Sequence, residues 1–116
     1  MNKILWCLSG CIAFSMGILM AQKLNDEALH LMQLDRDFDK ATAEKGVEGW
    51  VMYFASNGSM LGDTSQPTTG IAAIRAEMEP VFKDSSFSLR WHPTKAEMMI
   101  PGIIGYSRQM GKASEK

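Results

Sequence analysis

Apolar side chains between residues 24 and 46 recur every three or four positions, which is the spacing of one face of an α-helix. The opposite face carries polar residues such as Arg36 and Lys40, which suits contact with water. Asn25 favours a helix start, and Gly46 favours a helix end. We therefore expect a long amphipathic helix that organises the fold, with an apolar face formed by Leu24, Leu31, Leu34, Phe38 and Thr42.

Asp35 breaks this pattern, because it lies one turn after Leu31 and close to Phe38 on the apolar face. An unpaired buried carboxylate is costly, so Asp35 must find hydrogen-bond partners or border a cavity. As a structural group it would be satisfied by backbone amides, by Arg75 or by a tryptophan N–H. As a functional group it would act as a base or a ligand anchor. We favour the structural interpretation, because most buried polar groups are simply hydrogen-bonded.

Two shorter helices are predicted after the long one. Residues 47–55 place Trp50, Val51 and Phe54 at helical spacing. A third helix begins after Thr69, whose side chain can cap it, and Pro80 should end or bend it. Its apolar face is formed by Ile71, Ile74 and Met78.

The remaining segments indicate strands and turns. Residues 59–61 form a short strand after the turn signal Asn57-Gly58, and residues 62–70 form a loop by composition. Residues 87–92 then alternate apolar and polar side chains, which is strand spacing. Pro93 interrupts this strand before the alternation resumes. A turn at Pro101-Gly102 precedes another strand from Ile103, and residues 109–116 are expected to be a frayed polar tail.

The N-terminus has the pattern of a targeting segment. Lys3 is followed by an uncharged apolar run from Ile4 to Ala21, which is typical of a secretory signal peptide. An uncleaved membrane anchor is the alternative, because about 18 apolar residues can just span a bilayer. Lipidation at Cys11 is disfavoured, since the apolar run continues past it. We favour cleavage and export to the periplasm or the medium, which leaves a mature chain without cysteine.

Composition limits the function further. The 116 residues suit one domain, and 12 basic against 13 acidic residues give a net charge of −1 without the basic patch of a nucleic-acid-binding protein. His30 and His92 are far apart, so no metal-ligand spacing is evident, and no cofactor is expected. Asp35-x-Asp37-x-Asp39 lacks the glycine and distal glutamate of a calcium loop. His92 could serve as an acid or base near neutral pH, but an exposed strand histidine is the favoured interpretation.

Helices first and an antiparallel hairpin afterwards predict an α+β fold with helices on one face of a sheet. The segments LDRDFDKATAEKGVEGWVMYFASNGSML, TGIAAIRAEMEP, FSLRWHPTKAE and IGY, in this order and spacing, resemble the SnoaL-like / DUF4440 branch of the NTF2-like superfamily. The resemblance covers nearly all of residues 24–106. It implies a cone, in which a long N-terminal helix and two shorter helices pack on a curved antiparallel sheet around an open pocket. On this basis residues 1–21 are a signal peptide or anchor, 22–108 the domain and 109–116 the tail.

The sequence departs from the family pattern in two respects. Further long strands usually complete the cone, so the sheet here is expected to be incomplete, with an unpaired edge that favours a homodimer. The catalytic set of ketosteroid isomerase, another member, does not carry over. Its general base would fall near Gly62, next to Asp63, and its phenol donor near Phe38. The family contains isomerases, dehydratases and cyclases as well as non-catalytic binding modules.

These observations favour a non-catalytic module that binds a hydrophobic small molecule or a partner. An isomerase or lyase with Asp35 as proton shuttle is the second hypothesis, and a truncated copy that acts only as a dimer subunit is the third. Aromatic side chains at these spacings are more often core than pocket. If a pocket exists, we expect it to be lined by Asp35, Phe38, Trp50, Phe54, Trp91 and Tyr106.

Overall fold

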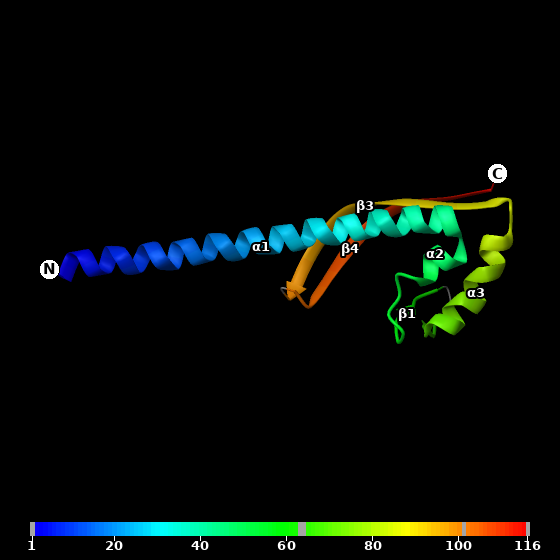
Figure 1. The fold of residues 1–116 in the computed structure, drawn as a ribbon, viewed down its shortest axis with the longest axis horizontal. Helices are drawn as coiled ribbons and strands as arrows, with labels where there is room; N and C mark the ends of the chain where they lie inside the picture. The colour runs from blue at the N-terminus through cyan, green and yellow to red at the C-terminus, as the bar shows by residue number, and fades with distance from the viewer. Residues whose placement is uncertain (1, 63–64, 101, 116) are drawn as a thin grey trace.

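The computed structural model describes the backbone of residues 2–62, 65–100 and 102–115, and the side chains of residues 16–62, 65–100 and 102–112. Its longest element is the helix α1 (Asn2–Lys45), against which the next helix and a long β-hairpin pack (Figure 1). The molecule measures 76 × 27 × 23 Å, because the N-terminal part of α1 projects beyond the rest of the domain. The architecture is α+β, with two short helices and two antiparallel sheets.

The helix does not begin near Asn25, as the sequence pattern predicted, but continues through it from Asn2. A cap residue favours a helix start by only about 1 kcal/mol, and no proline precedes Asn25 to interrupt the upstream turns. The predicted end is confirmed: α1 stops at Lys45, and Gly46 takes a positive φ of 61°. The signal-peptide prediction concerns residues 1–21, and the side chains of residues 1–15 lie outside the described part of the chain.

The helix α2 (Val47–Val51) folds back against the end of α1. It is shorter than the predicted helix 47–55. Gly49 makes this close approach possible, because a Cβ at that position would lie 2.0 Å from the carbonyl oxygen of Ala41. The side chain of Val51 is buried at the corner between the two helices.

A small sheet and the helix α3 follow. The strand β1 (Ser59–Met60) pairs with β2 (Thr68–Thr69), a strand that the sequence pattern did not predict. The helix α3 (Ile71–Lys83) begins after Gly70, and no side chain caps it, so the predicted cap at Thr69 is wrong. Pro80 lies inside α3, which continues to Lys83 rather than ending there. The hydroxyl of Thr69 instead shares a hydrogen bond of 2.7 Å with that of Ser59 across the small sheet.

The second sheet is a long hairpin of β3 (Phe87–Ile100) and β4 (Ile104–Glu115). Pro93 does not interrupt β3, because it stands at a register shift between Pro93 and Lys95, and a bulge is one of the few places where a strand tolerates proline. β4 continues to Glu115, so residues 109–115 are paired with β3 instead of forming a frayed tail. A polar composition does not prevent strand pairing when the partner strand is long enough.

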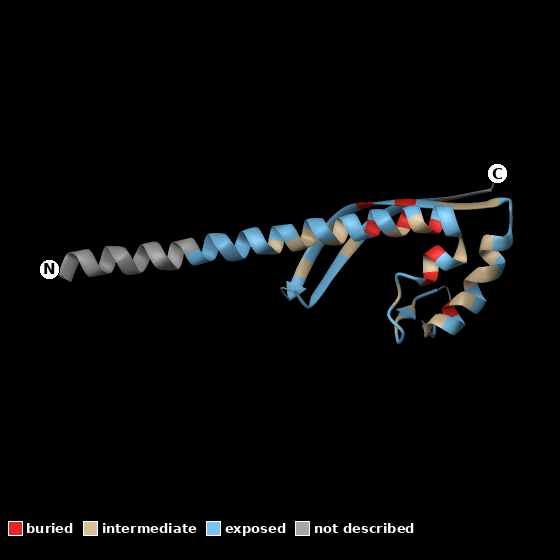
Figure 2. Cartoon of the chain, in the orientation of Figure 1, coloured by how far each residue is buried: buried red, intermediate tan, exposed pale blue. Residues whose placement is uncertain are grey.

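The core lies where the C-terminal half of α1 meets α2, α3 and β3 (Figure 2). Val51, Ile74, Trp91 and Pro93 are the buried apolar side chains among the described residues. The face of α1 toward the hairpin also buries three polar residues, Asp35, Asp39 and Thr42. The stability of this small core depends on hydrogen-bond partners for the carboxylates of Asp35 and Asp39, and the hairpin provides them.

Candidate functional site

Asp35 lies on the face of α1 toward the hairpin and is 6% exposed. Its Oδ1 accepts the indole N–H of Trp91 at 3.0 Å and the side-chain amide of Gln109 at 2.5 Å. Its Oδ2 accepts the hydroxyl of Ser107 at 3.0 Å. Both oxygens are therefore engaged, and one carboxylate joins α1 to both strands of the hairpin. The prediction that a tryptophan N–H satisfies Asp35 is confirmed.

Arg75, the other side-chain partner considered for Asp35, lies elsewhere. Its guanidinium forms an ion pair with Glu48 of α2, and this contact raises the pKa of Arg75. Arg75 belongs to α3, which packs on α2 and not on the face of α1 that carries Asp35. Of the alternative partners considered for Asp35, Arg75 is therefore not the one that the structure shows.

Asp39, one helical turn after Asp35, makes a second connection to the same strand. Its Oδ2 accepts from Nη2 of Arg90 at 2.7 Å, and its Oδ1 accepts from Nε of Arg90 at 3.0 Å and from the backbone N–H of Trp91 at 2.9 Å. Hydrogen bonding to the Arg90 guanidinium lowers the pKa of Asp39 below its ordinary 3.8, and the Trp91 amide acts in the same direction. Burial opposes this shift but does not overcome it.

The sequence pattern did not single out Asp39, although a usable signal was present. Asp35 and Asp39 are four residues apart, and Thr42 follows three residues later, so all three share one face of the helix. On a face that is otherwise apolar, two carboxylates in register call for donors on the facing element. Arg90 and Trp91, adjacent on the alternating strand, are such donors.

An aromatic cluster surrounds this connection. The ring of Phe38 lies 4.9–5.0 Å, between centroids, from the rings of Trp50, Tyr53 and Trp91, and 6.3 Å from that of Phe54. Four of the predicted pocket aromatics are thus brought together with Asp35, and Tyr53 joins them. Phe38 packs edge-to-face on Trp91 and Phe54, is tilted against Trp50 and is stacked on Tyr53, as the side chains of a core do.

Tyr106 lies apart from this cluster. Its hydroxyl bonds to Glu97 on the neighbouring strand, and its side chain is 40% exposed. Glu97 also pairs with Lys95, so these three side chains form a polar group on the outer face of the hairpin. His92 is likewise exposed on β3, and His30 is exposed on α1.

Two hollows lie between α1 and the hairpin. The smaller, of about 260 Å³, reaches Asp35 and is lined by Leu31, Leu34, Phe38, Tyr53, Ser107 and Gln109 as well. The larger is an open cleft of about 640 Å³ between residues 23–34 of α1 and the end of the hairpin. Its lining has an apolar part and a charged part. The apolar residues are Leu31, Leu34, Met98 and Ile103; the polar ones are Lys23, Asp26, Glu27 and His30.

The hairpin is attached to α1 at the end of the cleft. The backbone N–H of Gly102 donates to Oε2 of Glu27 at 2.8 Å, which fixes the hairpin turn against α1. Gly105 permits close packing at the other side, because a Cβ there would lie 2.5 Å from Sδ of Met98 and 3.1 Å from Cδ2 of Leu31. The sequence pattern did not predict this cleft, since it depends on how far the hairpin reaches along the helix.

The chain matches no model of a known protein family, and no curated protein is significantly similar to it in sequence.

Among the described side chains, those of residues 16–62, 65–100 and 102–112, no three histidine, cysteine or carboxylate groups are arranged as metal ligands would be. Asp37, the middle residue of the Asp-x-Asp-x-Asp pattern, accepts from Gln33 at 2.9 Å on the exposed face of α1. In the described part of the chain, no helical segment has both the length and the apolar character needed to cross a bilayer.

Proposed function

We propose that this protein is a non-catalytic module of the NTF2-like type that binds a hydrophobic small molecule in the cleft between α1 and the hairpin. The observation that carries the proposal is the cleft itself, of about 640 Å³, with leucine, methionine and isoleucine side chains in its lining. Ligand sites commonly have 300–1,000 Å³ and a mostly apolar lining with a few polar groups. The charged residues at the cleft supply such groups.

The order of elements supports the NTF2-like assignment. A long helix, two short helices and a long antiparallel hairpin follow one another in the sequence, as the resemblance implies. The two-stranded hairpin would be the part of the cone sheet that packs on the long helix. The proposed ligand would lie between the helix and this sheet.

The contacts of Asp35 favour binding over catalysis. A proton shuttle needs a carboxylate oxygen that faces the substrate, whereas both oxygens of Asp35 accept hydrogen bonds from Trp91, Ser107 and Gln109. These bonds have a structural purpose, because they connect α1 to the hairpin. The isomerase or lyase hypothesis therefore has less support than the binding hypothesis.

Binding can be tested with N-phenyl-1-naphthylamine, an uncharged probe whose fluorescence rises in apolar surroundings. We expect saturable binding to the protein and a loss of affinity of at least tenfold in Leu34→Glu, because Leu34 lines the cleft. Leu29→Glu is the matched control: Leu29 is also an exposed leucine of α1, at 56% against 41% for Leu34, but it does not line the cleft. Equal affinities of the two variants, or binding that never saturates, would refute the proposal.

A second candidate function, as a subunit of a homodimer, is favoured by the hairpin. Its sheet has two strands, so within the described residues each strand has one edge without a strand partner. Unpaired edges can pair with a second chain. Met110 lies on β4 and is 65% exposed, so an exposed apolar side chain accompanies the open edge.

A further inference from the structure

The turn end of the hairpin exposes large apolar side chains. Met99 and Ile103 are 70% and 75% exposed, and Ile100 and Ile104 are 46% and 48% exposed. These four residues, which we call the apolar tip, lie where the two strands meet, away from the core at the other end of the hairpin (Figures 1 and 2). A concentration of exposed apolar side chains at the end of a rigid hairpin indicates a contact surface.

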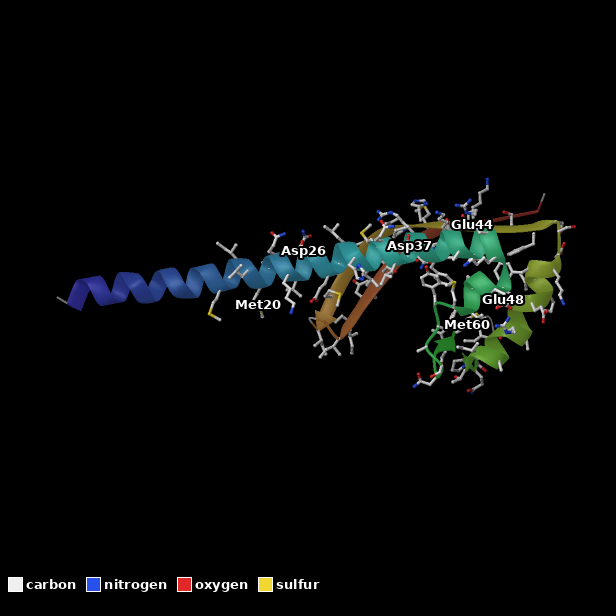
Figure 3. The ribbon with its side chains drawn as sticks, viewed as in Figure 1. Met20, Asp26, Asp37, Glu44, Glu48 and Met60 are labelled. Carbon is white, nitrogen blue, oxygen red and sulfur yellow. The ribbon has the colours of Figure 1, made fainter. Side chains whose placement is uncertain are left out.

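A second exposed apolar segment lies at the same end of the domain. Met16, Ile18, Leu19 and Met20 of α1 are 55–70% exposed. Figure 3 shows Met20 on the part of α1 that extends beyond the hairpin. These residues close the uncharged run from Ile4 to Ala21 in the sequence. The helix therefore carries an apolar segment that points out of the domain past the apolar tip.

The distance between the two apolar elements matches the structure of a bilayer surface. Gly102, between the tip residues, donates to Glu27, which places the tip at the level of residue 27 of α1. Six residues separate Glu27 from Ala21, so at 1.5 Å per residue the tip lies about 9 Å beyond the apolar run along the helix axis. The headgroup layer on each side of the hydrocarbon core is about 5–8 Å thick.

The charged residues between these elements are one basic side chain, Lys23, and two acidic ones, Asp26 and Glu27, so their net charge is −1. Nζ of Lys23 lies 3.8 Å from Oε1 of Glu27, and Gln22 donates to Asp26 at 3.1 Å. The long Lys23 side chain can extend its ammonium toward water. A group of residues with this net charge does not form the basic patch that recruits anionic lipids.

We propose that, in the chain that keeps its N-terminal segment, the apolar tip docks this domain on a lipid bilayer, with residues 16–20 of α1 entering the apolar layer and Met99, Ile100, Ile103 and Ile104 lying at the outer edge of the headgroup region. The lipid surface is chosen over a protein partner because the two apolar elements are offset along one axis by about the thickness of that region. The proposal does not depend on the cleft holding a ligand. It predicts binding to zwitterionic vesicles with little dependence on salt.

The test uses the full chain with Cys7→Ser and Cys11→Ser, and a single new cysteine that carries the polarity-sensitive dye NBD. The dye is placed at Ile103→Cys in one protein and at Leu61→Cys in the control, because Leu61 is even more exposed, at 84%, but follows β1 outside the hairpin. Each protein is mixed with phosphatidylcholine vesicles, and flotation shows the bound fraction. We expect the emission at position 103 to rise and shift to shorter wavelength, while that at position 61 stays unchanged.

Three results would overturn the proposal. The chain floats with the vesicles but the emission at position 103 does not change, so that the tip remains in water. The chain does not float at all. The emission at position 103 is already high without vesicles and falls on dilution, which would show that a second copy covers the tip.

Discussion

The indole N–H of Trp91 donates to Oδ1 of Asp35 at 3.0 Å, across 56 residues of sequence. The backbone N–H of the same residue donates to Asp39, one turn further along α1. A single strand residue is thus held by two carboxylates of one helix. This arrangement explains how a helix face can bury acidic side chains in a domain with so few fully buried apolar residues, since each carboxylate oxygen of Asp35 and Asp39 has a donor.

The role of Asp35 can be tested by changing its charge and its shape separately. Asp35→Asn keeps an oxygen for Trp91 and an amide that can donate to the hydroxyl of Ser107, so it should cost little. Asp35→Ala leaves the indole N–H buried without a partner and should lower the free energy of unfolding by about 1–3 kcal/mol. Thermal or urea unfolding measures both. A higher melting temperature for Asp35→Ala would favour a catalytic role, because functional sites often hold unfavourable groups.

Asp39 should make stability dependent on pH in the acid range. Its pKa in the folded protein is lowered, chiefly by Arg90, below the ordinary 3.8 that describes the unfolded chain. The unfolded state therefore binds the proton first, so the stabilisation from Asp39 is complete above about pH 4 and is lost as pH falls through the folded pKa. The difference in free energy of unfolding between wild type and Asp39→Asn should shrink between pH 6 and pH 3.

Asp37→Asn provides the matched control for this experiment. Asp37 lies on the same helix two residues earlier, but it is exposed and bonds only to Gln33 among the described partners. The free energy of unfolding of Asp37→Asn should depend on pH in the same way as that of the wild type. An Asp39→Asn difference that stays constant down to pH 3 would contradict the role assigned to the contact with Arg90.

The sequence predicted local features better than those that depend on distance. Gly46 as the end of the long helix and the alternation in residues 87–92 follow from the spacing of neighbouring residues. The predicted helix start at Asn25 was wrong, because a cap residue favours a start only weakly when the residues before it can also be helical. Pro80 does not end α3, which continues to Lys83. Pro93 does not interrupt β3, because a strand tolerates proline beside a bulge.

The candidate site was less predictable for a physical reason. Asp39 acquires its role only because Arg90, 51 residues later, lies opposite it. The cleft exists because the turn at Gly102 reaches back to Glu27, 75 residues earlier. Such pairings depend on the length and register of the hairpin, and the extension of β4 to Glu115 was hidden by its polar composition.

Trp50 should be a core residue whose ring matters more than its N–H. The ring contacts Phe38, Phe54, Phe82 and Trp91, with centroids 5.0–6.1 Å apart. Its Nε1 is buried without a hydrogen-bond partner among the described residues. Trp50→Ala should therefore cost about 3–5 kcal/mol, whereas Trp50→Phe should cost under about 1.5 kcal/mol, because it keeps an aromatic ring and removes an unsatisfied donor. If urea unfolding gives equal losses of unfolding free energy for Trp50→Ala and Trp50→Phe, the N–H of Trp50 has a partner.

Dimerisation through the hairpin should be visible as a change in mass. Met110 is exposed on β4, and Lys at this position would place a charge on the outer face of the sheet, which is a common way to block pairing of strand edges. Multi-angle light scattering should give a dimer for the wild type and a monomer for Met110→Lys. Met52→Lys, at an exposed methionine after α2, should leave the dimer intact. A wild type that remains monomeric at high concentration would rule out the homodimer.

Two glycine-to-alanine changes should act in opposite directions. At Gly49 the new methyl group would lie 2.0 Å from the carbonyl oxygen of Ala41 and 2.7 Å from the nitrogen of Thr42, and both atoms belong to the backbone of α1. The helices α1 and α2 must then separate, which should cost about 1–3 kcal/mol or more, as overpacking does.

At Gly17 no atom lies within 4 Å of the new methyl group. Alanine there should favour the helix by about 0.8–1.0 kcal/mol. Urea unfolding and circular dichroism measure the two effects, and a Gly49→Ala protein as stable as the wild type would show that α2 does not pack this closely on α1.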